Sequence, residues 1–369
     1  MILLYNKNLI LSMKHYSHCI IFVCGSMQRK IKLLSVSSLL LLPFLLLNVI
    51  SCSIVPRGTN TRNSEYLDQT PPKDSALLFA PGIVSTGTNE RDLAITPDGK
   101  EIFFCREVGG FKYNAIFHTK QVDGEWTNPE VLEFCRNVAY KYLEPHLSPD
   151  GSKLYFVSNM PTGSNKEDNF DIWVSEKKNG MWTKPYNIGA PINTKSKEFF
   201  PSVTTNGTIY YTHLDTAAKD EFIYRSRCIN GVYQQPEKLG PNVNIGKARF
   251  NALIAPDESF TIVPAFGMPD SFGGTDYYIV FRDSSDKWSK PINMGPKVNS
   301  DNPKEWSASL SSDGKYLFFM SARMGNYSID VLSRESINRF YNSPQNGNTD
   351  IYWISTSVIE ELRKKAVFE

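Results

Sequence analysis

Polar side chains recur at fixed distances before five similar turns of this chain. The turns begin at Asp98, Asp150, Asn206, Asp257 and Asp313, and the fourth, sixth and eighth residues before each turn fall on one side of an expected strand. The candidate site residues at these positions are Glu90, Asp92, Tyr142, Glu144, His146, Glu198, Arg249, Asn251 and Glu305. We expect their side chains to converge on the mouth of one channel.

The chemistry open to this set follows from its carboxylic acids. Carboxylates beside an arginine, a histidine, an asparagine and a tyrosine suit a sugar, a cation or a peptide terminus as ligand. Two carboxylates at a set separation can also hydrolyse a glycosidic bond, so a carbohydrate-active enzyme (a glycoside hydrolase or lyase) is the alternative to a binding or scaffolding module. The third interpretation is a solvated channel whose polar lining binds nothing.

No motif for a metal or a cofactor accompanies these residues. His118 and His213 stand alone, no cluster of His, Cys and Asp has metal-ligand spacing, and no Gly-rich loop follows a strand and opens a helix. We therefore expect no cofactor and no metal. The formal net charge of +2 lacks the basic excess that phosphate binding requires, which argues against a nucleic-acid partner.

The elements that position the candidate residues repeat along the chain. The turns follow one another at intervals of 52, 56, 51 and 56 residues, and each separates an alternating segment from a strongly apolar one, as in a β-hairpin closed by Asp-Gly or Asn-Gly. A third apolar segment follows in each unit, at residues 115–120, 171–177, 222–227, 276–282 and 350–355. A fourth runs from an aromatic residue to a proline, at residues 126–129, 182–185, 233–236 and 288–291. Four strands in about fifty residues are typical of a propeller blade.

The fifth unit has no fourth strand of its own. Residues 77–84 (LLFAPGIV), upstream of the first unit, occupy a fourth-strand position without a blade. We expect them to complete the last blade, which would remove the free sheet edge where the two ends of the chain meet. The sequence therefore predicts an all-β fold, a five-bladed β-propeller of four-stranded blades over residues 75–369.

The repeated phrase resembles a known family. EPHLSPDGSKLYF (residues 144–156) and ASLSSDGKYLFF (308–319), each followed by DIWVS or DIYWIS, are similar to the WD40-like (PD40) propeller repeats of the TolB type. The resemblance implies the propeller fold but no single function, because such repeats occur in scaffolds, peptidase domains and carbohydrate-active proteins. Two departures stand out: Glu258 replaces the turn glycine of the fourth unit, and an insertion at about 326–347 lengthens a loop of the fifth.

The first 74 residues differ in kind from the repeats. Arg29, Lys30 and Lys32 precede an apolar run that ends in Val49-Ile50-Ser51-Cys52, which is the layout of a secretory signal. The cysteine after the expected cleavage point resembles the lipobox of bacterial lipoproteins, and the resemblance implies lipidation of Cys52. A transmembrane anchor is the alternative. We expect residues 1–26 to precede the true start, 27–51 to form the signal peptide, and 52–74 to be a flexible tether.

These features together predict an exported protein of the bacterial cell envelope, anchored by lipid on a periplasmic or outer-membrane face. Its expected partner is an envelope protein or a glycan or peptide ligand, and its domain is expected to be monomeric. Once Cys52 is lipidated, Cys105, Cys135 and Cys228 remain. Their odd number does not describe a disulfide framework, so we expect buried, unpaired thiols.

Overall fold

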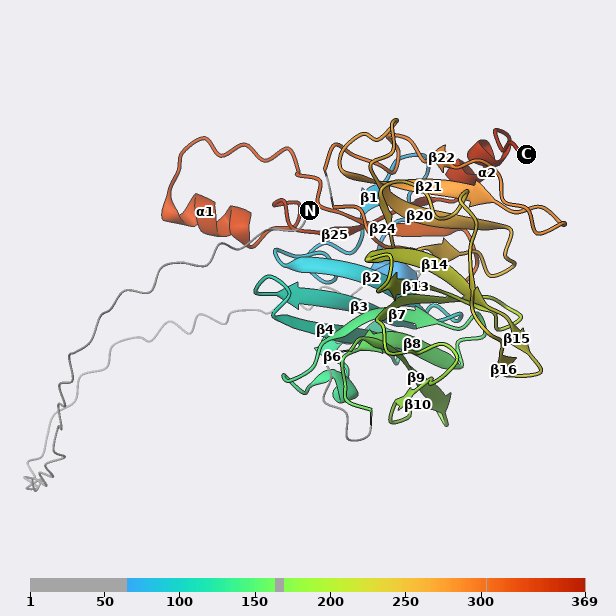
Figure 1. Cartoon of the computed structure of the whole chain (residues 1–369). Helices are drawn as coiled ribbons and strands as arrows, with labels where there is room; N and C mark the ends of the chain where they lie inside the picture. The colour runs from blue at the N-terminus through green and yellow to red at the C-terminus, as the bar shows by residue number, and fades with distance from the viewer. Residues whose placement is uncertain (1–64, 163–168, 303, 369) are drawn as a thin grey trace, which may run out of the picture. The chain divides into compact units, whose positions relative to one another are not determined.

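Five small antiparallel sheets form a ring (Figure 1). The computed structural model describes residues 65–162, 169–302 and 304–368. The first strands of all five sheets meet at the centre of the ring, where they line one cavity. The predicted five-bladed β-propeller is confirmed, whereas the expected signal peptide and Cys52 lie outside the described residues.

The first four blades are each built from consecutive strands. The first blade contains β2 (Asn89–Ile95), β3 (Glu101–Val108), β4 (Tyr113–Val122), β5 (Glu125–Trp126) and β6 (Glu130–Val131). The second contains β7 (Tyr142–Leu147), β8 (Lys153–Ser158), β9 (Asp171–Lys178), β10 (Met181–Trp182) and β11 (Tyr186–Asn187). The third contains β12 (Glu198–Val203), β13 (Ile209–Asp215), β14 (Asp220–Ser226) and β17 (Glu237–Lys238), with the ribbon β15 (Cys228–Ile229) and β16 (Val232–Tyr233).

The last two blades are more interrupted. The fourth contains β18 (Ala248–Arg249), β19 (Leu253–Ile254), β20 (Phe260–Phe266), β21 (Thr275–Phe281) and β22 (Ile292–Asn293). The fifth contains β23 (Ala308–Leu310), β24 (Tyr316–Ser321), β25 (Asp350–Ser355) and β1 (Leu77–Leu78). The short helices are η1 (Glu65–Asp68), η2 (Glu133–Cys135), α1 (Arg334–Tyr341) and α2 (Ser357–Arg363).

The outermost strands begin later than the sequence predicts. Trp126 and Trp182 pair with the end of their own third strand, in β5 and β10. The fourth strand proper starts directly after the proline, at Glu130 in the first blade and at Tyr186 in the second. The physical reason is that proline has no N–H to give to the ladder, so it marks the gap before the strand.

The start of the described chain closes the ring, as predicted. In the fifth blade, β1 pairs with β25 through Leu77 opposite Trp353 and Leu78 opposite Tyr352. The hydroxyl of Ser85 then donates to the carbonyl of Ile351 and accepts from its N–H, both at 3.2 Å.

In three other blades an asparagine makes the same pair of hydrogen bonds, which we call the clip. Asn193, Asn244 and Asn299 each accept from a third-strand N–H and donate to the carbonyl of the same residue, which is Ile172, Ile223 or Tyr277. Ser85 therefore occupies on the last blade the place that these asparagines hold on their own blades. This correspondence shows that the upstream segment is the missing part of the fifth unit.

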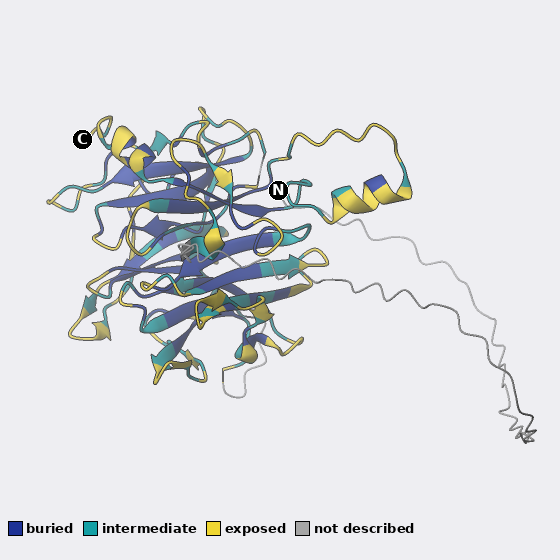
Figure 2. Ribbon diagram, turned by 180° about the vertical axis from the view of Figure 1, so that it is seen from behind, coloured by how far each residue is buried: buried dark blue, intermediate teal, exposed yellow. Residues whose placement is uncertain are grey.

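The core lies between neighbouring blades. Figure 2 shows buried residues along the strands and exposed residues in turns, loops and α1. Phe79 packs edge-on against Phe318 with ring centroids 5.0 Å apart, and Phe318 stacks on Trp353 at 5.6 Å. Because Phe79 comes from the closing segment and is fully buried, that segment contributes to the core as well as to the sheet.

Two acidic residues that open third strands hold nearby turns. Asp276 accepts from the N–H of Phe272 at 2.8 Å and from the amide of Asn293 at 2.9 Å. Asp350 accepts from the N–H of Gln345 at 2.6 Å, while its Oδ1 has no partner among the described residues. Burial is the main reason that the pKa of Asp350 rises to about 8.

We expect Asp350→Asn to stabilise the protein at pH 8. A carboxyl with a pKa raised from 3.8 to about 8 contributes stability in its protonated form, and this contribution is lost as the pH rises from about 4 towards 8. The wild type should thus lose up to about 1.4 kcal/mol per pH unit relative to the variant. Urea unfolding at pH 5 and pH 8 measures the difference. A difference independent of pH would contradict the expectation. Asp276→Asn, which loses a carboxylate that accepts from four donors, should destabilise at both pH values.

The insertion of the fifth blade lies between β24 and β25 and contains α1, which stands outside the sheets (Figure 1). Ser333 caps this helix through the N–H of Ser336 at 3.1 Å. The three cysteines after the tether are unpaired, as predicted; Cys105 and Cys135 are buried and Cys228 is half-buried. Among the described residues, no helix is long and apolar enough to cross a membrane.

Candidate functional site

A cavity of about 600 Å³ occupies the centre of the ring at the end where the five turns lie. We call this end the turn end and the opposite one the loop end. Every blade contributes to the wall, through Leu93–Ile95 and Pro97, His146–Asp150, Ser152, Lys153 and Tyr155, Val203–Thr205 and Gly207, Leu253, Ile254 and Pro256, and Ser309–Ser312. Pro97, Asp150, Thr205 and Pro256 are exposed at its rim, so the cavity opens to solvent.

Of the nine predicted site residues, His146 alone lines this cavity. Its Nε2 accepts from the N–H of Val203 in the next blade at 2.9 Å, and burial lowers its pKa to about 4. The ring is therefore neutral near pH 7, and with Nε2 as acceptor the proton sits on Nδ1.

Three predicted acids at the loop end are fully buried and hold loops of their own blades. Glu90, Glu198 and Glu305 each accept from a hydroxyl a few residues upstream, on Thr86, Thr194 and Ser300, at 2.6 Å in every case. Each also has a nitrogen partner on the second strand or just beyond it: Arg106 at 3.1 Å, His213 at 3.0 Å and Arg323 at 3.4 Å, respectively. Burial raises the pKa of Glu305 to about 7.

The remaining loop-end candidates are also enclosed. Arg249 is buried, pairs with Asp220 at 2.7 Å and donates to the carbonyl of Ile245 at 3.0 Å. Tyr142 is buried in the apolar cluster between the first two blades, and Asn251 is buried with its N–H on the hydroxyl of Thr212. The expectation that the nine side chains share one open mouth is thus wrong, although a binding role of any single residue stays a prediction.

An arginine that the sequence did not single out fills the axis between the two ends. Arg91 donates to Asp92 at 2.6 Å and, across to the next blade, to Glu144 at 3.0 Å. The other oxygen of Glu144 accepts from the N–H of Phe200 in the third blade at 2.7 Å. All three charged side chains are buried, and burial is the main reason that the pKa of Glu144 rises to about 7.

The reason that the pattern of alternation failed is a bulge in the inner strands. The register shifts between Arg91 and Ala94 in β2, and equivalent shifts occur in β7 and β12. The sixth residue before the turn has a left-handed φ at Asp92, Glu144, Phe200 and Asn251, between 47° and 57°. A bulge of this kind re-aims every side chain on its far side, so a period of two does not carry through it.

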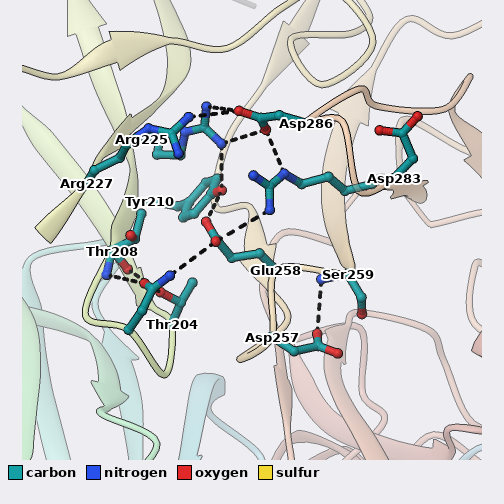
Figure 3. Close-up of polar contacts among 12 residues, drawn as sticks. Thr204, Thr208, Tyr210, Arg225, Arg227, Asp257, Glu258, Ser259, Asp283 and Asp286 are labelled. Atoms are coloured by element: carbon teal, nitrogen blue, oxygen red, sulfur yellow. Dashed lines mark hydrogen bonds and ion pairs between the residues drawn. The ribbon is translucent and has the colours of Figure 1, made fainter.

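A group of charged contacts lies between the third and fourth blades (Figure 3). Arg225 donates to both oxygens of Asp286 at 2.9 Å, and Arg282 donates to Asp286 at 2.6 Å. Glu258 accepts from the hydroxyl of Tyr210 at 2.7 Å and lies 3.4 Å from Arg282. This cluster explains why Glu258 replaces the turn glycine: it adopts the left-handed φ of 61° and uses its side chain to join two blades.

No group of three or more His, Cys, Asp or Glu residues in the described part of the chain is placed to hold a metal ion. In Figure 3, Arg225 and Arg282 are already paired with Asp286 and Glu258. The cavity at the turn end is therefore the candidate functional site, and the fold and cavity together define a β-propeller with a central pocket.

Comparison with known proteins assigns no family to this chain. No protein-family model and no curated protein matches the chain. Among solved structures, prolyl oligopeptidase B from Galerina marginata is 13% identical with a TM-score of 0.37, covering 74% of this chain and 39% of that one. An exo-β-1,3-galactanase from Clostridium thermocellum is 10% identical with a TM-score of 0.42, covering 76% and 62%. A puromycin-hydrolysing peptidase of Mycobacterium tuberculosis is 15% identical with a TM-score of 0.35, covering 63% and 34%. The chain thus spans less than two thirds of each of these proteins.

Proposed function

We propose that this protein is a binding module, a lipid-anchored propeller of the bacterial cell envelope whose repeats are of the PD40 type and whose ligand enters the cavity at the turn end. The observation that carries the proposal is the cavity itself. Its volume of about 600 Å³ lies in the range of small-ligand sites, its wall combines aliphatic side chains with hydroxyls, and its rim is exposed.

The same lining favours binding over glycoside hydrolysis. Asp150 is the one carboxylic acid that lines the cavity, and its Oδ1 accepts from the hydroxyl of Ser148 at 2.5 Å and from the N–H of Ser152 at 3.0 Å. A glycosidase needs two carboxylates on opposite sides of its substrate. Asp92 and Glu144 resemble such a pair in that the pKa of Glu144 is raised to about 7, but both are buried and bound to Arg91.

The envelope location rests on the sequence before the propeller. Cys52 follows a basic and then apolar segment, which supports lipidation of its thiol after cleavage. We expect Cys52→Ser to abolish incorporation of a labelled fatty acid when the protein is made in a bacterium, while Cys105→Ser leaves it unchanged. Equal labelling of the Cys52→Ser variant would contradict the lipoprotein assignment.

Binding in the cavity is tested by closing its rim. Thr205 is exposed and lines the cavity, so Thr205→Trp should narrow the entrance without disturbing the core. We expect this variant to lose signals that the wild type gives in a ligand-observed NMR screen of peptides and oligosaccharides. Lys100→Trp, at an exposed position of the same end that does not line the cavity, is the matched control and should bind as the wild type does. Equal binding by Thr205→Trp and wild type would rule out the cavity.

A further inference from the structure

The wall of the cavity contains open strand edges. The first strand of a blade has a neighbour on one side, so half of its backbone groups face the axis. In every blade, the residue two before the turn donates its N–H towards the second strand. The N–H of Thr96 donates to the carbonyl of Glu101 at 3.0 Å, and the N–H of Ser148 donates to that of Lys153 at 2.9 Å. Because hydrogen-bonding direction alternates along a strand, the preceding residue points its N–H and carbonyl towards the axis. These edge residues are Ile95, Leu147, Val203, Ile254 and Leu310.

Two of the five edges are capped by the blade before them. The N–H of Val203 donates to Nε2 of His146 at 2.9 Å, and the N–H of Ile254 donates to the hydroxyl of Ser202 at 3.0 Å. His146 and Ser202 hold the same position in their strands, four residues before the turn. A polar side chain at this position therefore closes the edge of the next blade.

The other three edges have no such cap. Ala94 holds the capping position for Leu147 of the next blade, and Leu253 holds it for Leu310. Neither side chain has an acceptor atom. Ser309 holds the capping position for Ile95 but makes no hydrogen bond to it. Within the described residues, the N–H groups of Ile95, Leu147 and Leu310 have no protein acceptor outside the ladders. All three residues line the cavity, so it is walled by backbone donors and acceptors that another chain can pair with.

We propose, resting on the binding function proposed above, that the ligand is a short peptide in extended conformation that pairs its backbone with the open edges of the first, second and fifth blades. An extended peptide offers N–H and carbonyl groups at the spacing of a strand edge, and strand addition gains its affinity from these main-chain bonds. Leu93 and Leu253 add aliphatic side chains to the lining. Besides the imidazole of His146, the lining has one aromatic side chain, that of Tyr155. Its hydroxyl faces that of Tyr233 at 3.4 Å, so the wall offers little surface for stacking of a sugar ring.

The test uses Ala94→Ser, which copies the Ser202 cap onto the second blade. The serine hydroxyl should accept from the N–H of Leu147 and so remove one open edge with a change of one atom. Fluorescein-labelled pentapeptides of Ala, Val, Leu and Ser are titrated into the full-length chain, in wild type and variant, and affinity is read by anisotropy. We expect binding at least tenfold weaker in Ala94→Ser and for peptides with N-methylated backbone amides. Ser202→Ala, which opens an edge instead of closing one, should not weaken binding.

Three results would overturn the proposal. If pentapeptides bind but neither Ala94→Ser nor N-methylation matters, the contact is not strand pairing. If labelled maltopentaose or chitopentaose binds in a way that Thr205→Trp abolishes while the peptides do not bind, the cavity takes a sugar, and the binding function survives without the peptide. If no probe of either kind shows binding that depends on Thr205, both the peptide and the binding function fail.

Discussion

Replacing Arg91 with methionine is expected to lower the free energy of unfolding by about 3–5 kcal/mol, the usual effect of removing one partner of a buried charge cluster. Arg91 holds Asp92 at 2.6 Å and Glu144 at 3.0 Å on the axis. Methionine fills a similar volume but leaves both carboxyls without a counter-charge. Urea unfolding at pH 7 measures the loss.

Two further variants separate charge from packing. Arg227→Met removes an arginine whose side chain is 45% exposed, and its ion pairs should be worth less than about 1 kcal/mol. Adding Asp92→Asn and Glu144→Gln to Arg91→Met removes the unpaired charges, and glutamine keeps an acceptor for the N–H of Phe200. We expect this triple variant to recover most of the lost stability. If it stays as unstable as Arg91→Met, the arginine acts through packing and not through charge.

Removing the closing segment is expected to have the larger effect. A chain that begins at Thr86 lacks β1, Phe79 and the Ser85 clip, whereas a chain that begins at Glu65 keeps them. Losing one buried phenylalanine costs about 3–5 kcal/mol, and total stabilities are about 5–15 kcal/mol. The shorter chain should therefore lose cooperative thermal unfolding and its near-UV circular dichroism.

Rescue in trans distinguishes closure from general damage. A synthetic peptide of residues 65–85 should bind the shorter chain and restore cooperative unfolding, because its partners on β25 are intact. A peptide in which Phe79 is replaced by alanine should restore less. A shorter chain that unfolds at the same temperature as the longer one would show that the ring does not need this segment.

The sequence predicted those parts of the fold that depend on local chemistry. Asp-Gly and Asn-Gly mark hairpins because few other pairs accept a left-handed turn, and the missing strand of the fifth unit followed from counting the repeats. The clip residues Asn193, Asn244 and Asn299 recur at the repeat interval, each in the position that Ser85 holds ahead of the first unit. The prolines are the one feature of the sequence that indicates where the fourth strands begin, because proline cannot donate to the ladder.

The candidate site was harder to predict because a backbone irregularity decides which side chains meet. Asp and Asn are enriched at left-handed φ, so this conformation suits Asp92 and Asn251. Glu144 and Phe200 adopt it too, although their residue types do not favour it. The bulge buries the acids, brings Arg91 onto the axis, and leaves the open volume at the opposite end. His146 was found because it lies on the turn side of the bulge, where the alternation still holds.

The seam of the ring has a consequence for how the protein is made. Ser85 and Ile351 hydrogen-bond although 266 residues separate them, so the fifth blade is incomplete until nearly the whole chain has left the ribosome. Joining segments so far apart costs chain entropy that local hairpins do not pay. Until β25 arrives, β1 and the outer edge of β24 have no partner, so the ring stays open until the last strand of the chain is made.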